Sequence, residues 1–150
     1  MTNKRTITIL TLLFLAVVPN LHASKCSNAS LTGKYAYFFS GFTQVTADVS
    51  PAGFVPWAQS GLIVYDGKGN ILSGTFTAST TTANGGLLRG TFTGTYTVNG
   101  DCAGTVLVDL GDGTIFNFDL VVQGPEKHTY IPTDPDSFLG ITSFQKIVGE

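Results

Sequence analysis

The stretch Thr91–Val98 reads TFTGTYTV, and its alternation decides the fold class. Every second residue is a threonine, and the residues between them are Phe92, Gly94, Tyr96 and Val98. In an extended chain these two sets point to opposite faces, so one face is polar and the other is apolar. Such a stretch is typical of an antiparallel strand that covers a core with one face and meets water with the other.

The same alternation recurs along the chain, which carries almost no helical signal. In Ile71–Thr80 it predicts that Leu72, Gly74, Phe76 and Ala78 face inward. Eight segments in all are expected to form strands: Lys34–Phe42, Trp57–Tyr65, Ile71–Thr80, Leu87–Val98, Gly104–Leu110, Thr114–Gln123, Lys127–Thr133 and Phe138–Ile147.

Short turns rich in Gly, Asn and Asp separate most of these segments, so consecutive strands are expected to form hairpins. We therefore predict an all-β, eight-stranded antiparallel up-and-down barrel, which leaves no unpaired edge. Gly74, Gly94 and Gly104 lie inside strands and predict bulges or sharp bends. The long connection Thr43–Pro56 is expected to fold over one mouth. An outer-membrane barrel is the alternative, and the threonine-rich and serine-rich face disfavours it.

The stretch Tyr65–Gly74, YDGKGNILSG, offers a choice between a calcium loop and a turn. Counted from Asp66, an EF-hand loop needs an oxygen ligand, a glycine and a glutamate at the positions that Lys68, Ile71 and Thr77 occupy. The calcium interpretation therefore fails. The glycines and Asn instead predict a tight turn between two strands.

The N-terminus predicts export. Lys4 and Arg5 precede an apolar run of 12 residues, Ile7–Val18, which is too short to span a bilayer. We expect residues 1–23 to form a signal peptide, followed by a single domain over residues 24–150 in a secreted or periplasmic protein. A lipoprotein is disfavoured because Lys25 precedes Cys26. Asn28 begins a glycosylation sequon that matters only in a eukaryotic source.

Charge and cysteines narrow the function classes. After the expected cleavage the chain keeps six Lys and Arg against ten Asp and Glu, a net charge of −4, without basic clusters. Nucleic acid and anionic membranes are therefore disfavoured as partners. Cys26 and Cys102 are expected to form a disulfide that pins the N-terminal segment beside the turn Asn99–Ala103. No transmembrane span of the mature chain, no metal site and no cofactor is expected, and the oligomeric state stays open.

Three stretches together carry a resemblance: GKYAYFFSGF from Gly33, GLIVYDGKGNILSG from Gly61, and GTFTGTYTVNGDCAGT from Gly90. The chain resembles small secreted bacterial proteins of uncharacterised function with an allene oxide cyclase-like barrel, and a lipocalin-like barrel is the near alternative. The resemblance implies the fold and the exported state. It transfers no catalytic residue.

Few side chains point to chemistry. His128 is the one histidine after the expected cleavage site, and we interpret it as a solvated histidine at a strand entry. Asn117 and Asp119 alternate with Phe116 and Phe118, so they face water if the phenylalanines point inward. If the barrel is wet inside, they line it together with Asp109.

Aromatic residues at inward positions are the candidate ligand-binding set. Tyrosines among them would place hydroxyl groups in an apolar cavity, or would simply be core aromatics with hydrogen-bond partners. The candidates are Tyr35, Tyr37, Phe39, Trp57, Phe76, Phe92 and Tyr96.

Three functions follow from such a barrel. The first is an exported protein that binds a small apolar molecule. The second is a non-catalytic envelope or matrix protein with a packed interior. The third is a cyclase or isomerase that templates a reaction by shape. A cavity of a few hundred Å³ would separate the first and third from the second.

Overall fold

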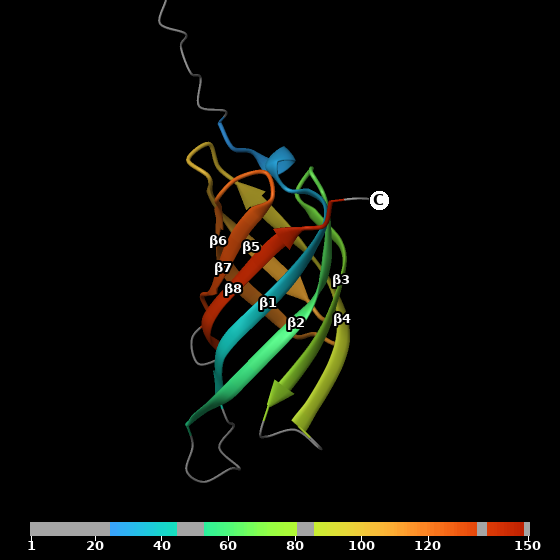
Figure 1. The fold of residues 1–150 in the computed structure, drawn as a ribbon, viewed down its shortest axis with the longest axis vertical. Helices are drawn as coiled ribbons and strands as arrows, with labels where there is room; N and C mark the ends of the chain where they lie inside the picture. Colours follow the sequence, from blue (N-terminus) through green and yellow to red (C-terminus); the bar gives the residue numbers. More distant parts are fainter. Residues whose placement is uncertain (1–24, 45–52, 81–85, 135–137, 149–150) are drawn as a thin grey trace, which may run out of the picture.

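The computed structural model of the chain describes residues 25–44, 53–80, 86–134 and 138–148. Consecutive strands pair antiparallel and β8 pairs with β1, so the sheet closes into a barrel (Figure 1). The all-β, eight-stranded antiparallel prediction is confirmed. The strands are β1 (Thr32–Gln44), β2 (Phe54–Asp66), β3 (Asn70–Thr80), β4 (Leu87–Val98), β5 (Ala103–Asp109), β6 (Ile115–Val122), β7 (Lys127–Pro132) and β8 (Phe138–Lys146).

The alternation in β4 is realised as predicted. Phe92, Tyr96 and Val98 are buried, while the threonines between them are exposed. One of these threonines extends the polar face to the next strand, since Thr97 Oγ1 lies 2.9 Å from Thr105 Oγ1 on β5. The outer face of this side of the barrel is therefore polar, as the sequence indicates.

The inward prediction for β3 is wrong at Leu72. Its side chain is 59% exposed, while its neighbour Ile71 is buried. The register shows the reason, because Tyr65 pairs with Ile71 but Val64 pairs with Ser73. One extra residue in β3 forms a bulge that shifts the phase of the alternation by one. The bulge lies just before Gly74, where a bulge was predicted.

Glycines inside the strands make room for neighbours. The ring of Phe92 lies over its cross-strand partner Gly74, where an added Cβ would come within 2.1 Å of the ring. Gly90 receives the ring of Phe76 in the same way. Gly94 pairs with Ile71 at the register shift between β3 and β4, whereas the register is continuous at Gly104, so no bulge occurs there. At Gly104 an added Cβ would instead come within 1.9 Å of a neighbouring carbonyl oxygen.

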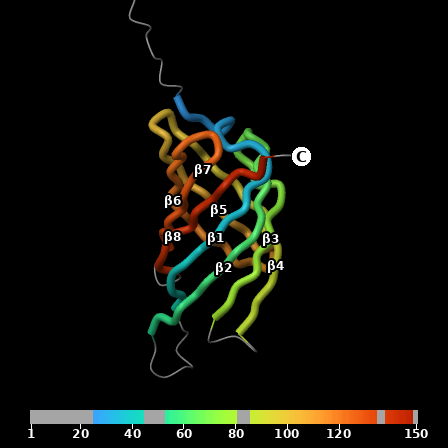
Figure 2. Tube along the Cα trace, viewed as in Figure 1, coloured from blue at the N-terminus to red at the C-terminus, as the bar shows by residue number. Residues whose placement is uncertain are grey.

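One end of the barrel is closed by the N-terminal segment. The 3-10 helix η1 (Asn28–Ser30) lies across this end, where the chain also leaves β8 (Figures 1 and 2). Asn28 Oδ1 accepts the Val98 backbone N–H at 2.7 Å, and Leu31 is fully buried beneath η1. Cys26 and Cys102 stand at disulfide distance, with Cα atoms 4.9 Å apart. The bond ties η1 to the β4–β5 turn, as predicted.

The stretch Asp66–Asn70 is a turn at the same end. The Asp66 carboxylate accepts the backbone N–H groups of Lys68 and Asn70 at 2.7 and 2.9 Å, and the Asn70 side-chain amide at 2.6 Å. These hydrogen bonds lower the pKa of Asp66 to about 2. Gly67 and Gly69 take positive φ. The carboxylate therefore serves the turn, which confirms the turn prediction.

The connection between β1 and β2 is shorter than predicted. β1 continues to Gln44 and β2 begins at Phe54, so both strands take residues from the expected loop. Most of the loop Thr43–Pro56 that was expected to fold over a mouth, residues 45–52, lies outside the described residues, as does the expected signal peptide, residues 1–23. No helix within the described residues has the length and apolar character needed to cross a membrane.

Candidate ligand-binding site

The barrel interior has two unlike halves. The half beneath η1 is filled with side chains and is called here the closed half. Its centre is a set of aromatic rings in edge contact, with the Tyr65 ring 5.4 Å from Tyr35 and 5.2 Å from Tyr96. Aliphatic side chains complete it: Leu31, Ile71, Val98, Val106, Leu120 and Val122 are all buried.

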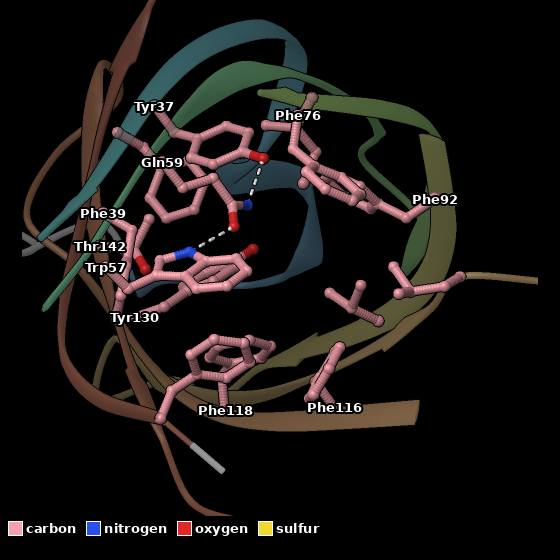
Figure 3. Close-up of a pocket in the computed structure, with 15 residues that line it drawn as sticks. Tyr37, Phe39, Trp57, Gln59, Phe76, Phe92, Phe116, Phe118, Tyr130 and Thr142 are labelled. Carbon is pink, nitrogen blue, oxygen red and sulfur yellow. Dashed lines mark hydrogen bonds between the residues drawn. The ribbon is translucent and has the colours of Figure 1, made fainter. Parts of the chain in front are cut away.

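The half toward the opposite end contains a pocket of about 140 Å³ that is partly open to solvent (Figure 3). This volume is close to that of a cavity that binds benzene and below that of pockets for drug-sized ligands. The wall is lined mainly by aromatic and aliphatic side chains, with one glutamine and one threonine among them. The lining residues are Tyr37, Phe39, Trp57, Gln59, Ile63, Phe76, Phe92, Val108, Leu110, Phe116, Phe118, Tyr130, Phe138, Thr142 and Phe144.

The structure brings together five of the seven candidate residues. Tyr37, Phe39, Trp57, Phe76 and Phe92 all line the pocket.

The other two candidates, Tyr35 and Tyr96, are buried in the closed half. The Tyr35 hydroxyl donates to the Pro125 carbonyl at 3.1 Å, and the Tyr96 hydroxyl lies 2.9 Å from the Leu31 carbonyl. Both tyrosines serve the core with satisfied hydroxyls.

Several wall residues were not among the candidates. Phe138 and Phe144 lie six residues apart on β8, so they share a face of that strand. Phe116 and Phe118 lie two residues apart on β6 and share a face in the same way. The period of two would have found them. Gln59 carries no such signal, because a glutamine on a strand usually faces water.

One polar array crosses the pocket wall. Trp57 Nε1 donates to Gln59 Oε1 at 3.2 Å, and Gln59 Nε2 donates to the Tyr37 hydroxyl at 2.9 Å (Figure 3). The Tyr37 hydroxyl in turn donates to the Thr75 carbonyl at 3.1 Å. Burial raises the pKa of Tyr37 to about 12, so this phenol stays protonated. The array holds Trp57 in the wall and leaves no unpaired Tyr37 proton.

A second polar array lies deeper, and it corrects the prediction for His128. This side chain is 1% exposed rather than solvated, because β7 begins at Lys127 and turns the next residue inward. Its imidazole Nε2 lies 2.9 Å from the Tyr65 hydroxyl, which is also hydrogen-bonded to the Tyr130 hydroxyl. Within the described chain, the buried Nδ1 has no hydrogen-bond partner.

Burial also sets the protonation states of this array. Desolvation lowers the pKa of His128 to about 3, so the imidazole is neutral at neutral pH. Desolvation likewise raises the pKa of the Tyr65 and Tyr130 phenols above their usual range. All three groups are therefore uncharged, and the array offers hydrogen bonds but no charge.

The polar residues of β6 face outward, as expected if the phenylalanines point inward. Asn117 and Asp119 are exposed, and the Asn117 side chain donates to Asp134 at 2.8 Å. Asp109 accepts the Gly111 N–H at 2.7 Å in the β5–β6 turn. Across the described residues no group of three or more His, Cys, Asp or Glu side chains is placed to hold a metal ion.

The described wall includes no carboxylate, lysine or arginine, so its chemistry is that of an apolar container with a few neutral hydrogen-bonding groups. No protein-family model matches the chain, and neither a curated protein nor a solved structure shows significant similarity to it.

Proposed function

We propose that this protein binds a small apolar molecule, about the size of one six-membered ring, in the pocket at the open end of the barrel. The pocket itself is the main support. Its wall is apolar and aromatic, and a single ring would fill about 140 Å³. The volume falls below the few hundred Å³ that would separate a binding or catalytic barrel from a packed one, so we restrict the proposed ligand to a molecule of about one ring.

The contrast between the two halves also supports binding. Side chains fill the interior of the closed half, whereas the other half leaves a pocket. An enclosed void of this size would cost roughly 3 kcal/mol of stability, which is an upper limit for a pocket that is partly open. A structural barrel gains nothing from that cost, whereas a binding protein recovers part of it when the ligand enters.

Binding is favoured over catalysis for a chemical reason. A cyclase or isomerase gains from a charged or strongly polarised group at the reacting atoms. The wall holds neutral phenols, one amide, one hydroxyl and one indole. We therefore rank templated catalysis and a packed structural role behind a carrier or scavenger of a small molecule.

Export is part of the same proposal. The cysteine pair at disulfide distance is compatible with an oxidising, extracellular compartment. Residues 1–23 are proposed as the signal peptide, and residues 24–150 as the mature domain of a secreted or periplasmic protein.

The test uses Trp57, the single tryptophan of the chain and a residue of the pocket wall. Toluene is titrated into the mature protein while Trp57 fluorescence is followed. We expect a saturable change with a dissociation constant on the order of 0.1–1 mM. Val108→Phe, which places a ring in the pocket, should weaken binding at least tenfold.

Val121→Phe is the matched control, because Val121 lies on β6 with its side chain 49% exposed. This variant should bind toluene like the wild type. If toluene causes no saturable change in the wild type, or if both variants bind equally well, the pocket is not a binding site.

A further inference from the structure

The buried array of Tyr130, Tyr65 and His128 has one hydrogen-bond donor more than it has hydrogen bonds between its members. Each neutral phenol carries one O–H and the neutral imidazole carries one N–H, which makes three donors. The three side chains make only two hydrogen bonds with one another, Tyr130 to Tyr65 and Tyr65 to His128. One donor is therefore always left over. If both ends donate to Tyr65, the leftover proton is that of the Tyr65 hydroxyl, which is buried away from the pocket, so this arrangement is disfavoured. In the two remaining arrangements the leftover donor stands at an end of the array.

The leftover donor can stand at either end, depending on the direction of the hydrogen bonds. In one direction Tyr130 donates to Tyr65 and Tyr65 donates to His128 Nε2, which puts the imidazole proton on Nδ1. That atom is buried and has no partner among the described residues. A buried N–H without an acceptor is costly, and a ligand in the pocket cannot relieve that cost, because His128 does not line this pocket.

In the other direction His128 Nε2–H donates to Tyr65, and Tyr65 donates to Tyr130. The leftover proton is then that of the Tyr130 hydroxyl. Tyr130 lines the pocket, whereas Tyr65 and His128 do not (Figure 3). The Tyr37 hydroxyl already donates to the Thr75 carbonyl, so it offers the pocket no free proton.

We infer that the ligand carries one hydrogen-bond acceptor oxygen, such as that of a small cyclic ketone, which accepts the Tyr130 hydroxyl while His128 holds its proton on Nε2. This inference deepens the proposed function and rests on it. Only the acceptor oxygen needs a polar partner. The rest of the molecule lies against the aromatic wall.

Packing holds the array in place for this role. The His128 ring stacks on Phe144 with centroids 4.1 Å apart, and Tyr130 lies 4.3 Å from the same ring. Thr142, the cross-strand partner of Tyr130, contributes a third hydroxyl to the wall, beside those of Tyr37 and Tyr130. It is the competing donor that an experiment must separate from Tyr130.

The test compares cyclohexanone with methylenecyclohexane, which has the same shape but no acceptor oxygen. Calorimetry gives the affinity of both for the wild type, Tyr130→Phe, Thr142→Val and Tyr35→Phe. We expect Tyr130→Phe to weaken cyclohexanone binding about tenfold and to leave methylenecyclohexane binding unchanged. Tyr35→Phe removes a buried hydroxyl outside the pocket, so neither affinity should change.

Nitrogen-15 NMR of the His128 side chain gives a second measurement that needs no variant. With cyclohexanone bound to the wild type, Nε2 should carry the proton and Nδ1 should be bare. A proton on Nδ1 in that complex contradicts the inference, even where Tyr130→Phe does not fold.

The outcomes separate the two proposals. If both probes bind and Tyr130→Phe weakens the binding of both equally, the Tyr130 assignment is wrong. The same holds if Thr142→Val is the only variant that weakens cyclohexanone binding without weakening methylenecyclohexane binding. In both cases the proposal that the pocket binds a small molecule still holds. If neither probe binds the wild type, the proposed function fails, and the inference fails with it.

Discussion

The His128 imidazole lies nearly parallel to the ring of Phe144, with 12° between the planes and 4.1 Å between the centroids. The two ring nitrogens of the imidazole lie at its edge, outside the stack, and Nε2 is hydrogen-bonded to the Tyr65 hydroxyl. No carboxylate is hydrogen-bonded to the ring among the described residues. A protonated His128 would therefore be a charge without a partner inside the barrel.

This arrangement predicts that the protein loses stability in mild acid. The pKa of His128 is about 3 in the folded state and near 6.5 in the unfolded chain, so the unfolded chain binds the proton first as pH falls. The stability that comes from burying a neutral His128 is complete above about pH 6.5 and is lost as the pH falls toward 3. The free energy of unfolding should be about 2–3 kcal/mol lower at pH 4.5 than at pH 7.5.

Chemical denaturation at the two pH values measures this loss, and His128→Phe is the comparison. Phenylalanine keeps the stack on Phe144 but does not titrate, so most of the difference should vanish in this variant. Asp66 does not interfere, because its pKa is lowered to about 2 and its own loss begins only below about pH 4. An equal pH dependence in the variant and the wild type would show that His128 is not the titrating group.

The contact between Gly74 and Phe92 predicts a strong coupling. Gly74→Ala would put a Cβ 2.1 Å from the Phe92 ring, so we expect it to destabilise the barrel by about 1–3 kcal/mol. In a Phe92→Ala background the same change should be far less costly. Urea denaturation of the four proteins in this cycle gives the coupling energy.

Gly100→Ala is the control for this cycle, because nothing lies within 4 Å of an added Cβ there. It should leave stability nearly unchanged. If Gly74→Ala lowers the free energy of unfolding equally in the wild-type and Phe92→Ala backgrounds, the Phe92 ring does not pack against Gly74.

The disulfide predicts a separation of stability from binding. Replacing both Cys26 and Cys102 by alanine removes a cross-link over 76 residues, so unfolding should become easier by about 4 kcal/mol. The lining of the pocket includes neither cysteine and no residue of η1. At temperatures below its unfolding midpoint, the variant should bind toluene with a dissociation constant within about twofold of the wild-type value. A folded variant that has lost binding would mean that the closed end shapes the pocket.

Much of the fold is predictable from local patterns, because each strand repeats a period-two signal and the turns carry Gly, Asn and Asp. Leu72 shows the limit. A bulge of one residue is invisible to the alternation itself and reverses it locally. The continuous register at Gly104 shows that a glycine in a strand does not by itself mark a bulge.

The site was only partly predictable for a related reason. The period of two tells which residues point inward but not how far along the barrel axis they lie. Tyr35 and Tyr37 share a face, yet the first lies in the closed half and the second lines the pocket. The array of Tyr65, His128 and Tyr130 joins residues more than 60 positions apart, and only barrel closure brings them together.

Bromobenzene diffused into crystals of the mature protein tests the central claim most directly, because the anomalous signal of bromine locates the ligand. The account predicts one bromine peak inside the barrel, among Phe116, Phe118 and Phe138, and its loss in Val108→Phe crystals. A barrel interior without a peak, or bromine found only on the outer face, would contradict the claim that this barrel is a container for small apolar molecules.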